Sequence, residues 1–255
     1  MAESSGERPN TVRPKWNFDV RESGRSKEGE QTFLDRRLFM QLLVFRCEPG
    51  QDPAVVIRGA AEAMTEAGVA SVIYEDVNDP QSFGVLTWAE DPEHFVTRVR
   101  PLLAGHRLGG ASLRSDFTMF GRTYSIGYEE DLPFWLIDKP QRTVMNEETP
   151  WAVWYPLRRT GAFATLPARE QGSILREHGV IGKGYGSRGL ASDVRLACHG
   201  IDGNDNEFVI GLIGKELHPL SHVVQTMRKT RQTAEFIEKM GPFFVGRVAR
   251  RTQGR

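Results

Sequence analysis

Residues 38–46 read LFMQLLVFR, an apolar, β-rich run that begins the order of elements from which the fold can be predicted. A proline at position 53 marks the start of a helix, because proline is tolerated in the first helical turn. The turn-forming pair Asp79-Pro80 separates the two strands predicted after that helix. The predicted elements are a strand at 38–46, a helix at 53–67, strands at 69–77 and 83–88, a helix at 92–104 and a strand at 117–128. This order is a β-α-β-β-α-β unit, the ferredoxin-like motif.

The same order recurs later in the chain, which indicates an internal repeat. Phe208 follows Phe83 at the interval that also separates Gly246-Arg247 from Gly121-Arg122. The second set of predicted elements is a strand at 151–159, a helix at 167–179, strands at 194–199 and 208–213, a long helix at 219–237 and a strand at 243–248. We therefore predict an α+β fold of two fused ferredoxin-like halves whose sheets pack together. The predicted divisions are an arm at 1–33, disordered or loosely docked because it has few apolar side chains, and halves at 34–141 and 142–255.

The composition is that of an ordinary globular protein. The 255 residues include 33 Lys+Arg and 33 Asp+Glu, and this balance argues against a dedicated nucleic-acid binder. No apolar run is long enough to predict a membrane span, and residues 1–33 lack the apolar stretch of a secretory signal. Cys47 and Cys198 form no metal-spaced pair and are typical of reduced thiols. We expect a cytoplasmic protein.

The two halves carry chemically different side chains at one matched position. The segment 66–69 (EAGV) aligns with 177–180 (EHGV), so that His178 replaces Ala67 at the predicted end of the matched helix. A Gly-rich stretch, GKGYGSRGLASD (182–193), follows in the second half and is predicted to be an extra loop. A duplicated scaffold with one differentiated half commonly carries its site there, so the second half is the candidate.

His178 has two interpretations. It shares a helical face with apolar neighbours, the face being Gln171, Ile174, Leu175, His178 and Ile181. The first interpretation is a hydrogen-bonded core histidine. The second is an axial ligand to haem iron, since a neutral imidazole in an apolar pocket binds that metal. The remaining histidines are weaker candidates: His94, His106, His199, His218 and His222.

The strand WAVWYPLRR (151–159) concentrates aromatic and cationic side chains. By alternation, Tyr155 shares a face with Trp151 and Val153. This pattern fits a core strand, but a tyrosine beside a haem can also be oxidised to a radical, and arginines can pair with carboxylates. The basic segment MRKTRQT (227–233) is likewise either a solvated helical face or a cradle for haem propionates.

The second half resembles the chlorite dismutase superfamily, and especially its coproheme decarboxylase branch. The resemblance covers roughly residues 142–247, and the first half agrees in architecture and in FGRTYS (120–125). The motifs that carry it are Tyr-Pro-Leu-x-Arg (155–159), Leu-Pro-x-x-Glu (166–170), Glu-His-Gly-x-Ile-Gly (177–182), Asp-Val-Arg (193–195), Asn-Glu-Phe-Val (206–209), Met-Arg (227–228) and Pro-Phe-Phe-x-Gly-Arg (242–247). Each motif is short, but their order and spacing together are specific.

The resemblance implies a fold and a cofactor. Family members pair their ferredoxin-like halves in a dimeric α+β barrel and assemble as homo-oligomers, usually pentamers. The expected cofactor is an iron porphyrin, haem b or coproheme, held in the second half with His178 as the metal ligand. Tyr155 matches the tyrosine that forms a radical in the decarboxylases, and Arg159 falls where a basic partner of the reacting propionate is expected. The positions that match propionate contacts are Arg142, Arg228 and Thr233.

Two departures qualify the implied reaction. Chlorite dismutases place an arginine after a Val-Lys/Arg pair to hold the oxychlorine intermediate, whereas Leu196 follows Val194-Arg195 here. Leu196 is therefore the expected residue beside the cofactor on its distal side, with Arg195 as the alternative, and we expect no chlorite dismutation. A tryptophan common after the Tyr-Pro strand is replaced by Phe163.

The resemblance leaves three hypotheses open. The first is an enzyme that uses hydrogen peroxide to decarboxylate coproheme to haem b, with the porphyrin as both substrate and redox cofactor, so that no other cofactor is implied. The second is a haem carrier, sensor or weak peroxidase. The third is a barrel that binds no haem and acts as an assembly module or a cofactor-free oxygenase-like protein.

Overall fold

Two four-stranded sheets meet edge to edge in the computed structural model, which describes residues 18–104 and 108–254. The first sheet has the order β7-β3-β5-β4, so the last strand of its ferredoxin-like unit lies beside the first. The elements of this half are β3 (Phe39–Arg46), α1 (Pro53–Glu66), β4 (Ser71–Asp76), β5 (Ser82–Ala89), a π-helical segment (Phe95–Val99) continuing into α2 (Arg100–Leu102), β6 (Ser112–Leu113), a 3-10 turn (Ser115–Phe117) and β7 (Met119–Thr123).

The second half repeats this arrangement with the strand order β12-β8-β10-β9. Its elements are β8 (Trp151–Arg159), α4 (Gly161–Thr165), α5 (Ala168–Gly186), β9 (Ser192–Ala197), β10 (Phe208–Gly214), α6 (Leu217–Met227), α7 (Arg231–Phe236), β11 (Ile237–Met240) and β12 (Phe244–Thr252). A π-helical segment (Phe134–Asp138) and α3 (Lys139–Met145) connect the halves. The prediction of two ferredoxin-like halves is confirmed.

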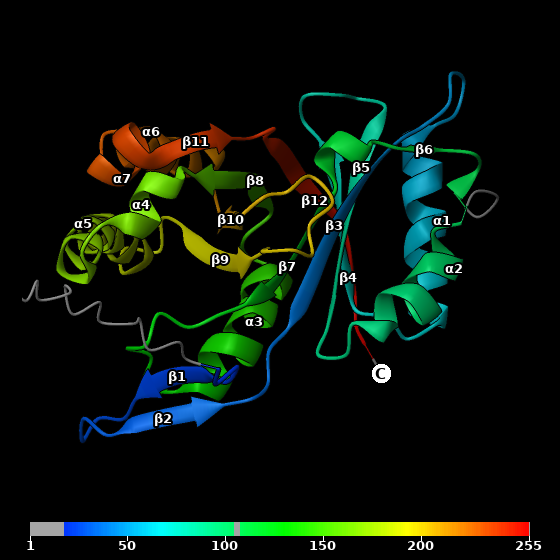
Figure 1. The fold of residues 1–255 in the computed structure, drawn as a ribbon. Coiled ribbons are helices and arrows are strands. Elements are labelled where there is room, and N and C mark those ends of the chain that lie inside the picture. Colours follow the sequence, from blue (N-terminus) through cyan, green and yellow to red (C-terminus); the bar gives the residue numbers. More distant parts are fainter. Residues whose placement is uncertain (1–17, 105–107, 255) are drawn as a thin grey trace, which may run out of the picture.

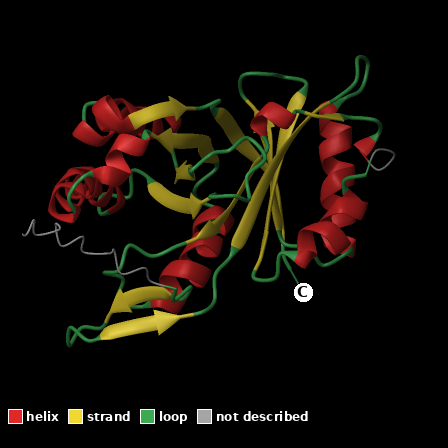
Figure 2. Cartoon of the chain, viewed as in Figure 1, coloured by secondary structure: helices red, strands yellow, loops and turns green. Residues whose placement is uncertain are grey.

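The two sheets close into a barrel. Antiparallel pairing of β7 with β9 and of β4 with β12 joins the halves, while β10 pairs with β8 inside the second half. Every strand of the ring therefore has a neighbour on both sides, which removes exposed edges. Figure 1 shows α1 and α2 outside one half and α4 to α7 outside the other, and Figure 2 shows these helices flanking the strands.

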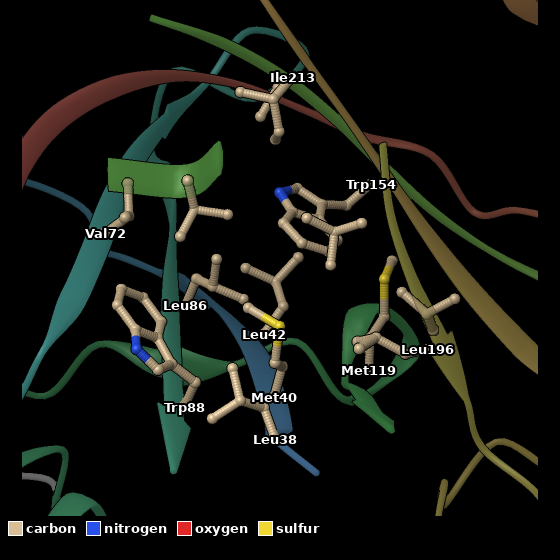
Figure 3. Packing of buried hydrophobic residues seen from close by; sticks show 14 of the residues in the cluster. Leu38, Met40, Leu42, Val72, Leu86, Trp88, Met119, Trp154, Leu196 and Ile213 are labelled. Carbon is tan, nitrogen blue, oxygen red and sulfur yellow. The ribbon is translucent and has the colours of Figure 1, made fainter. Parts of the chain in front are cut away.

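The barrel interior is the main hydrophobic core. Trp154 is fully buried there, and Figure 3 shows it with Leu42, Met119 and Leu196 inside the ring of strands. Gly211 faces Trp154 across the β8–β10 pairing, and a Cβ on this glycine would lie 2.5 Å from the indole ring. The interior is therefore packed so closely that a larger residue at this position would have to displace the indole.

Two further apolar clusters lie outside the barrel. One joins α1 and its neighbours to the first sheet, and the other joins α5 and α6 to the outer face of β8 and β10. Strand alternation decides which cluster a residue of β8 enters, because Trp154 faces inward and Tyr155 faces outward. The outer face of the second half is the surface that carries Tyr155.

The structure corrects two predicted helices. The helix expected at 167–179 continues to Gly186, so residues 182–186 of the predicted Gly-rich loop are helical and His178 lies within the helix. Packing of Tyr185 against α6 offsets the low helix propensity of the glycines. The helix expected at 219–237 is divided into α6 and α7, because Thr230 caps the second helix through the N–H of Thr233.

The arm is ordered over its described part. Residues 22–34 form a hairpin, β1 (Glu22–Arg25) and β2 (Gln31–Leu34), rather than an irregular segment. Glu22 accepts hydrogen bonds from Arg122, at 2.6 Å, and from the N–H of Ser125. This part of the arm is thereby docked on β7, whereas residues 1–17 of the prediction lie outside the described residues, and the divisions at 33/34 and 141/142 stay predictions.

Candidate functional site

His178 lies between two apolar contacts of α5. One turn before it, Ile174 is buried against Phe163 and Phe236. About one turn after it, Ile181 packs on the cluster that covers the outer face of β8 and β10. The imidazole is therefore carried on the side of the helix that faces the sheet.

The His178 ring is neutral and incompletely bonded. Burial lowers its pKa, and the positive charge of Arg195 lowers it further against the opposite effects of Glu177 and Asp193. Its Nδ1 atom is buried without a hydrogen-bond partner among the described residues. The buried nitrogens of a core histidine are expected to be hydrogen-bonded. The missing hydrogen bond therefore favours a histidine that binds a ligand over a histidine with a structural role.

The helix that carries His178 is sparsely covered. Ile174 is the single buried residue among the 19 of α5, and Val180 is 66 % exposed. Helices that pack directly on a sheet usually bury a continuous apolar stripe. Among the described residues, most of α5 has no buried apolar stripe of this kind. This arrangement is compatible with a binding site between the helix and the sheet.

Opposite α5, the outer face of the sheet presents two rows of side chains. The strand registers align Tyr155 with Ile210 and Ile210 with Arg195, across β8, β10 and β9. A parallel row contains Asp193, aligned with Leu212 of β10. Because neighbouring strands lie about 4.8 Å apart, Tyr155 and Arg195 are roughly 10 Å from each other on the same face.

Tyr155 is a buried phenol. Its ring stacks on that of Phe243 with 4.7 Å between centroids, and 6 % of the residue is exposed. Burial raises the pKa of Tyr155 far above its usual value, the negative charge of Asp193 raises it further, and Arg228 opposes the increase. Tyr155 therefore keeps its proton at any physiological pH.

Asp193 is the centre of a charged group beside this phenol. It accepts a hydrogen bond of 2.8 Å from Lys139 and pairs with Arg195 at 3.1 Å. Burial alone would raise the pKa of Asp193, but the charges of Lys139 and Arg195 outweigh it and hold the pKa below its usual value. Arg195 also lies 3.9 Å from Glu129. The group places ionised side chains of both signs at the edge of the site.

Arg159 is held by neighbouring residues. Its Nε donates to Glu207 at 3.1 Å, and its backbone N–H donates to the same carboxylate at 2.9 Å. The guanidinium lies between the rings of Phe163 and Phe208, 4.5 and 4.7 Å from their centroids. Phe163, which replaces the expected tryptophan, is thus buried as a platform for Arg159.

A cavity of about 510 Å³ opens beside Arg159. Gln171 and Leu175 of α5 line it, together with His199 and Glu207. Leu175 is about one helical turn before His178, so the cavity opens on the N-terminal side of that histidine. Its volume is within the range of roughly 300–1,000 Å³ that small-molecule sites occupy.

The three residues predicted to contact the propionates lie on different elements around the outer face of the second half. Arg228 ends α6, and its charge reaches Tyr155; it also lines a second cavity of about 520 Å³ together with Phe243. Thr233 is half-buried on α7, bonded to Thr230. Arg142 is exposed on α3 and pairs with Asp138 at 3.5 Å, and no described contact joins it to His178 or Tyr155.

Leu196 lies on the other side of the sheet from Tyr155. It is 2 % exposed inside the barrel, and this burial speaks against the prediction that it contacts the cofactor on the distal side. Alternation along β9 places Asp193 and Arg195 outward and Leu196 inward. Arg195, the alternative, is the residue that shares the face of Tyr155. The same alternation, applied to the sequence of β9, would also have identified Asp193.

The contacts of two further candidates could not have been found by motif. Lys139 and Glu207 reach the site only through tertiary contacts with Asp193 and Arg159. Within the described ranges, no three His, Cys, Asp or Glu side chains gather closely enough to hold a metal ion, so a protein-only metal site is absent there. Among the weaker histidines, His199 lines the cavity, and His106 lies outside the described residues.

The comparisons with known proteins point to one family. Residues 115–249 match the family model described as "Chlorite dismutase". Two curated proteins, from two strains of Thermus thermophilus, are both named coproheme decarboxylase and are 31 % identical over 113 residues. That match covers 43 % of this chain and 43 % of each relative, so it spans less than half of their length.

Solved structures support the fold over a larger part of the chain. A haem-binding protein from Thermus thermophilus is 20 % identical, with a TM-score of 0.66 over 84 % of this chain and 91 % of that one. Chlorite dismutase from Candidatus Nitrospira defluvii, solved in complex with imidazole, is 12 % identical, with a TM-score of 0.66 over 85 % of this chain and 93 % of that one. At these identities the likeness is one of fold alone.

Proposed function

Because the chain belongs to the chlorite dismutase family, we propose that it binds an iron porphyrin between α5 and the outer face of the second half, and that it decarboxylates coproheme to haem b with hydrogen peroxide. The family includes haem-binding proteins, and the curated relatives are named for this reaction. The proposal extends that reaction to a chain that matches less than half of their length.

The observation that carries the proposal is the state of His178. A neutral imidazole with an unpartnered buried nitrogen, on a sparsely covered helix, fits the single axial ligand that a haem needs. The apolar side chains around it, Ile174 and Ile181, suit a flat hydrophobic group. The donor set therefore fits a porphyrin iron, which supplies the redox chemistry with peroxide when it is bound.

Tyr155 is the proposed redox-active residue of the chain. Since its phenol stays protonated, loss of an electron must be accompanied by loss of the Oη proton. Asp193, held ionised by Lys139 and Arg195, lies on the same face and raises the pKa of that phenol. After losing one electron and its Oη proton, Tyr155 would abstract a hydrogen atom from the propionate and so re-form its O–H bond; the carboxylate of Asp193 is the group on this face that would accept the released proton.

Basic residues would orient the propionates of the substrate. Arg228 is placed to do so, because its charge already reaches Tyr155. Arg159 can do so only if an incoming carboxylate competes with Glu207 for the guanidinium. The roles of Thr233 and Arg142 follow from the resemblance alone and are part of the proposal.

The test is a coproheme titration of the purified chain, followed by stepwise addition of peroxide and mass spectrometry of the porphyrin. We expect stoichiometric binding and sequential loss of two carboxyl groups. Tyr155→Phe should bind coproheme equally well and yield no vinyl product, whereas His178→Ala should lose the binding. Vinyl formation by Tyr155→Phe would overturn the role of that tyrosine.

One observation favours a second function, a haem carrier, sensor or weak peroxidase. Glu207 satisfies Arg159, the expected partner of the reacting propionate, within the protein. Under this alternative the porphyrin binds and peroxide only bleaches it, without stepwise loss of mass. Binding without decarboxylation would therefore replace the first proposal, and absence of binding would leave only the fold.

The assembly and location are part of the same proposal. The family resemblance supports a homo-oligomer, usually a pentamer, which sedimentation of the purified chain would test. In the described residues no helix is long and apolar enough to cross a membrane. The unpaired cysteines Cys47 and Cys198 support a reducing, cytoplasmic environment.

A further inference from the structure

A second tyrosine makes a feature that the proposed reaction does not use. The Oη atom of Tyr185, on α5, lies 2.5 Å from Nδ1 of His222 on α6. The ring centroids are 5.9 Å apart with a tilt of 47°. Of the tyrosines in the described ranges, this is the one whose phenol is hydrogen-bonded to a histidine.

Two neighbouring atoms compete for the single proton of the phenol. The oxygen of Thr226, whose own hydroxyl proton is donated to the carbonyl of His222 at 2.9 Å, lies 3.0 Å from Oη of Tyr185, whereas Nδ1 of His222 lies at 2.5 Å. When the proton of His222 is on Nε2, the lone pair of Nδ1 accepts the phenol proton at 2.5 Å. In that tautomer, Tyr185 has a base placed to receive its proton over a short hydrogen bond.

The pair connects the candidate site with the surface. Tyr185 follows His178 by two helical turns on the same side of α5, a rise of about 10 Å. It packs against the apolar cluster that includes Tyr155, while the contact with His222 lies at an exposed position. An electron could pass from Tyr185 to a group bound at His178 without crossing solvent, and small reductants can reach the other side of the pair.

We propose that Tyr185 and His222 form a redox-active pair that carries oxidising equivalents from the porphyrin pocket to the protein surface, an inference that rests on the proposed function. Peroxide is the oxidant. Tyr185 gives up one electron to the oxidised cofactor site; its O–H bond breaks, and an N–H bond forms at Nδ1 of His222. A thiol from the solvent then returns the electron to the oxidised Tyr185, releases its own proton and becomes a thiyl radical, while Nδ1 returns its proton to the phenolate oxygen. Two such turns consume one peroxide and give two water molecules, and the two thiyl radicals couple to a disulfide. The pair would protect the pocket whenever peroxide reacts before substrate is in place.

The first arm of the test uses the full chain without porphyrin. A ruthenium tris-bipyridine photo-oxidant with persulfate generates tyrosyl radicals, which electron paramagnetic resonance quantifies. Tyr185→Phe should remove most of the early signal, while Tyr128→Phe, a control at a 75 % exposed tyrosine, should remove little. His222→Gln keeps an acceptor but no base and should slow the oxidation roughly a hundredfold, as loss of a general base does. Equal rates in all four proteins would overturn the pair.

The second arm loads the same proteins with haem and adds peroxide without substrate. The unmodified chain should give a tyrosyl radical that the Tyr185→Phe variant lacks. Haem bound to the Tyr185→Phe variant should bleach several-fold faster than haem bound to the unmodified chain. If the pair is oxidised in the first arm but Tyr185→Phe changes neither readout in the second, the connection to the pocket is refuted. If none of the proteins binds haem, the proposed function fails instead, while the first arm still decides the pair. A purely structural contact would lower the melting temperature of Tyr185→Phe and leave both radical readouts unchanged.

Discussion

Leu196 and Arg195 are adjacent in sequence and face opposite sides of β9, so truncating each one to alanine should affect different properties. Leu196 is 2 % exposed in the barrel interior, and replacing a buried leucine by alanine costs about 2–5 kcal/mol of stability. The side chain of Arg195 is 30 % exposed and pairs with Asp193 at 3.1 Å. Partly exposed ion pairs contribute about 0.2–1 kcal/mol, so Arg195→Ala should change stability by no more than that.

The effect on binding should be the reverse. Arg195 lies on the face that carries Tyr155, where its positive charge attracts the carboxylates of a porphyrin. Losing about 0.5–1 kcal/mol of attraction corresponds to a two- to fivefold weaker coproheme affinity. Leu196 touches only the interior, so Leu196→Ala should keep the affinity of the unmodified chain as long as it is folded.

Urea unfolding followed by circular dichroism gives the stability of both variants, and an absorption titration with coproheme gives their affinities. We expect a large shift in the urea midpoint for Leu196→Ala alone and a change in affinity for Arg195→Ala alone. Weaker binding by a fully folded Leu196→Ala, with an unchanged Arg195→Ala, would refute the assignment of the two faces and return Leu196 to the site.

Three further predictions concern His178 and the packing of the barrel. His178→Ala should weaken haem binding by more than about tenfold in an absorption titration, because even changes to the partners of a metal ligand cost 10–100-fold; unchanged affinity and spectrum would exclude it as the ligand. The pKa of His178 is lowered by burial, so the unfolded chain takes up this proton at a higher pH than the folded chain, and the unfolding free energy of the porphyrin-free protein should fall on acidification. His178→Gln should lose that part of the pH slope in urea unfolding, and an identical slope would contradict the assignment. Gly211→Ala should cost about 1–3 kcal/mol in the same assay, since its Cβ would lie 2.5 Å from Trp154; a neutral effect would mean that the indole moves freely.

The sequence was sufficient for the repeat and for most strands. The apolar run at 151–159 coincides with β8, and the equivalent positions Phe83 and Phe208 both lie near the start of matched strands. These features depend on local patterns of apolar residues, which sequence displays directly. The closure of the barrel depends on β7–β9 and β4–β12 pairing between distant segments, and only the resemblance predicted it.

The errors have specific physical causes. Glycines at 182, 184 and 186 predict a loop, yet tertiary contacts of Tyr185 keep this segment helical. The break between α6 and α7 depends on the cap that Thr230 provides, a signal hidden inside a basic, helix-compatible segment.

For the candidate site, the sequence indicated His178 and Tyr155, which the structure places on α5 and on the outer face of β8. Alignment by motif led to Leu196, whereas strand alternation would have led to Arg195. The engagement of Arg159 by Glu207 joins residues far apart in sequence and could not be predicted from either motif. Their roles in binding and catalysis stay predictions.

The closed barrel imposes an order on synthesis of the chain. β4 ends at Asp76 and cannot complete its pairing until β12, which begins at Phe244, has been synthesised. At translation rates of about 5–20 residues per second, that interval lasts roughly ten to thirty seconds. During it, a nascent first half carries two open edges, at β4 and β7, that match the edges of any other unfinished copy on the same polysome. The architecture that leaves the finished barrel without an edge thus makes its unfinished chains prone to join one another, and gives a chaperone a defined period in which to act.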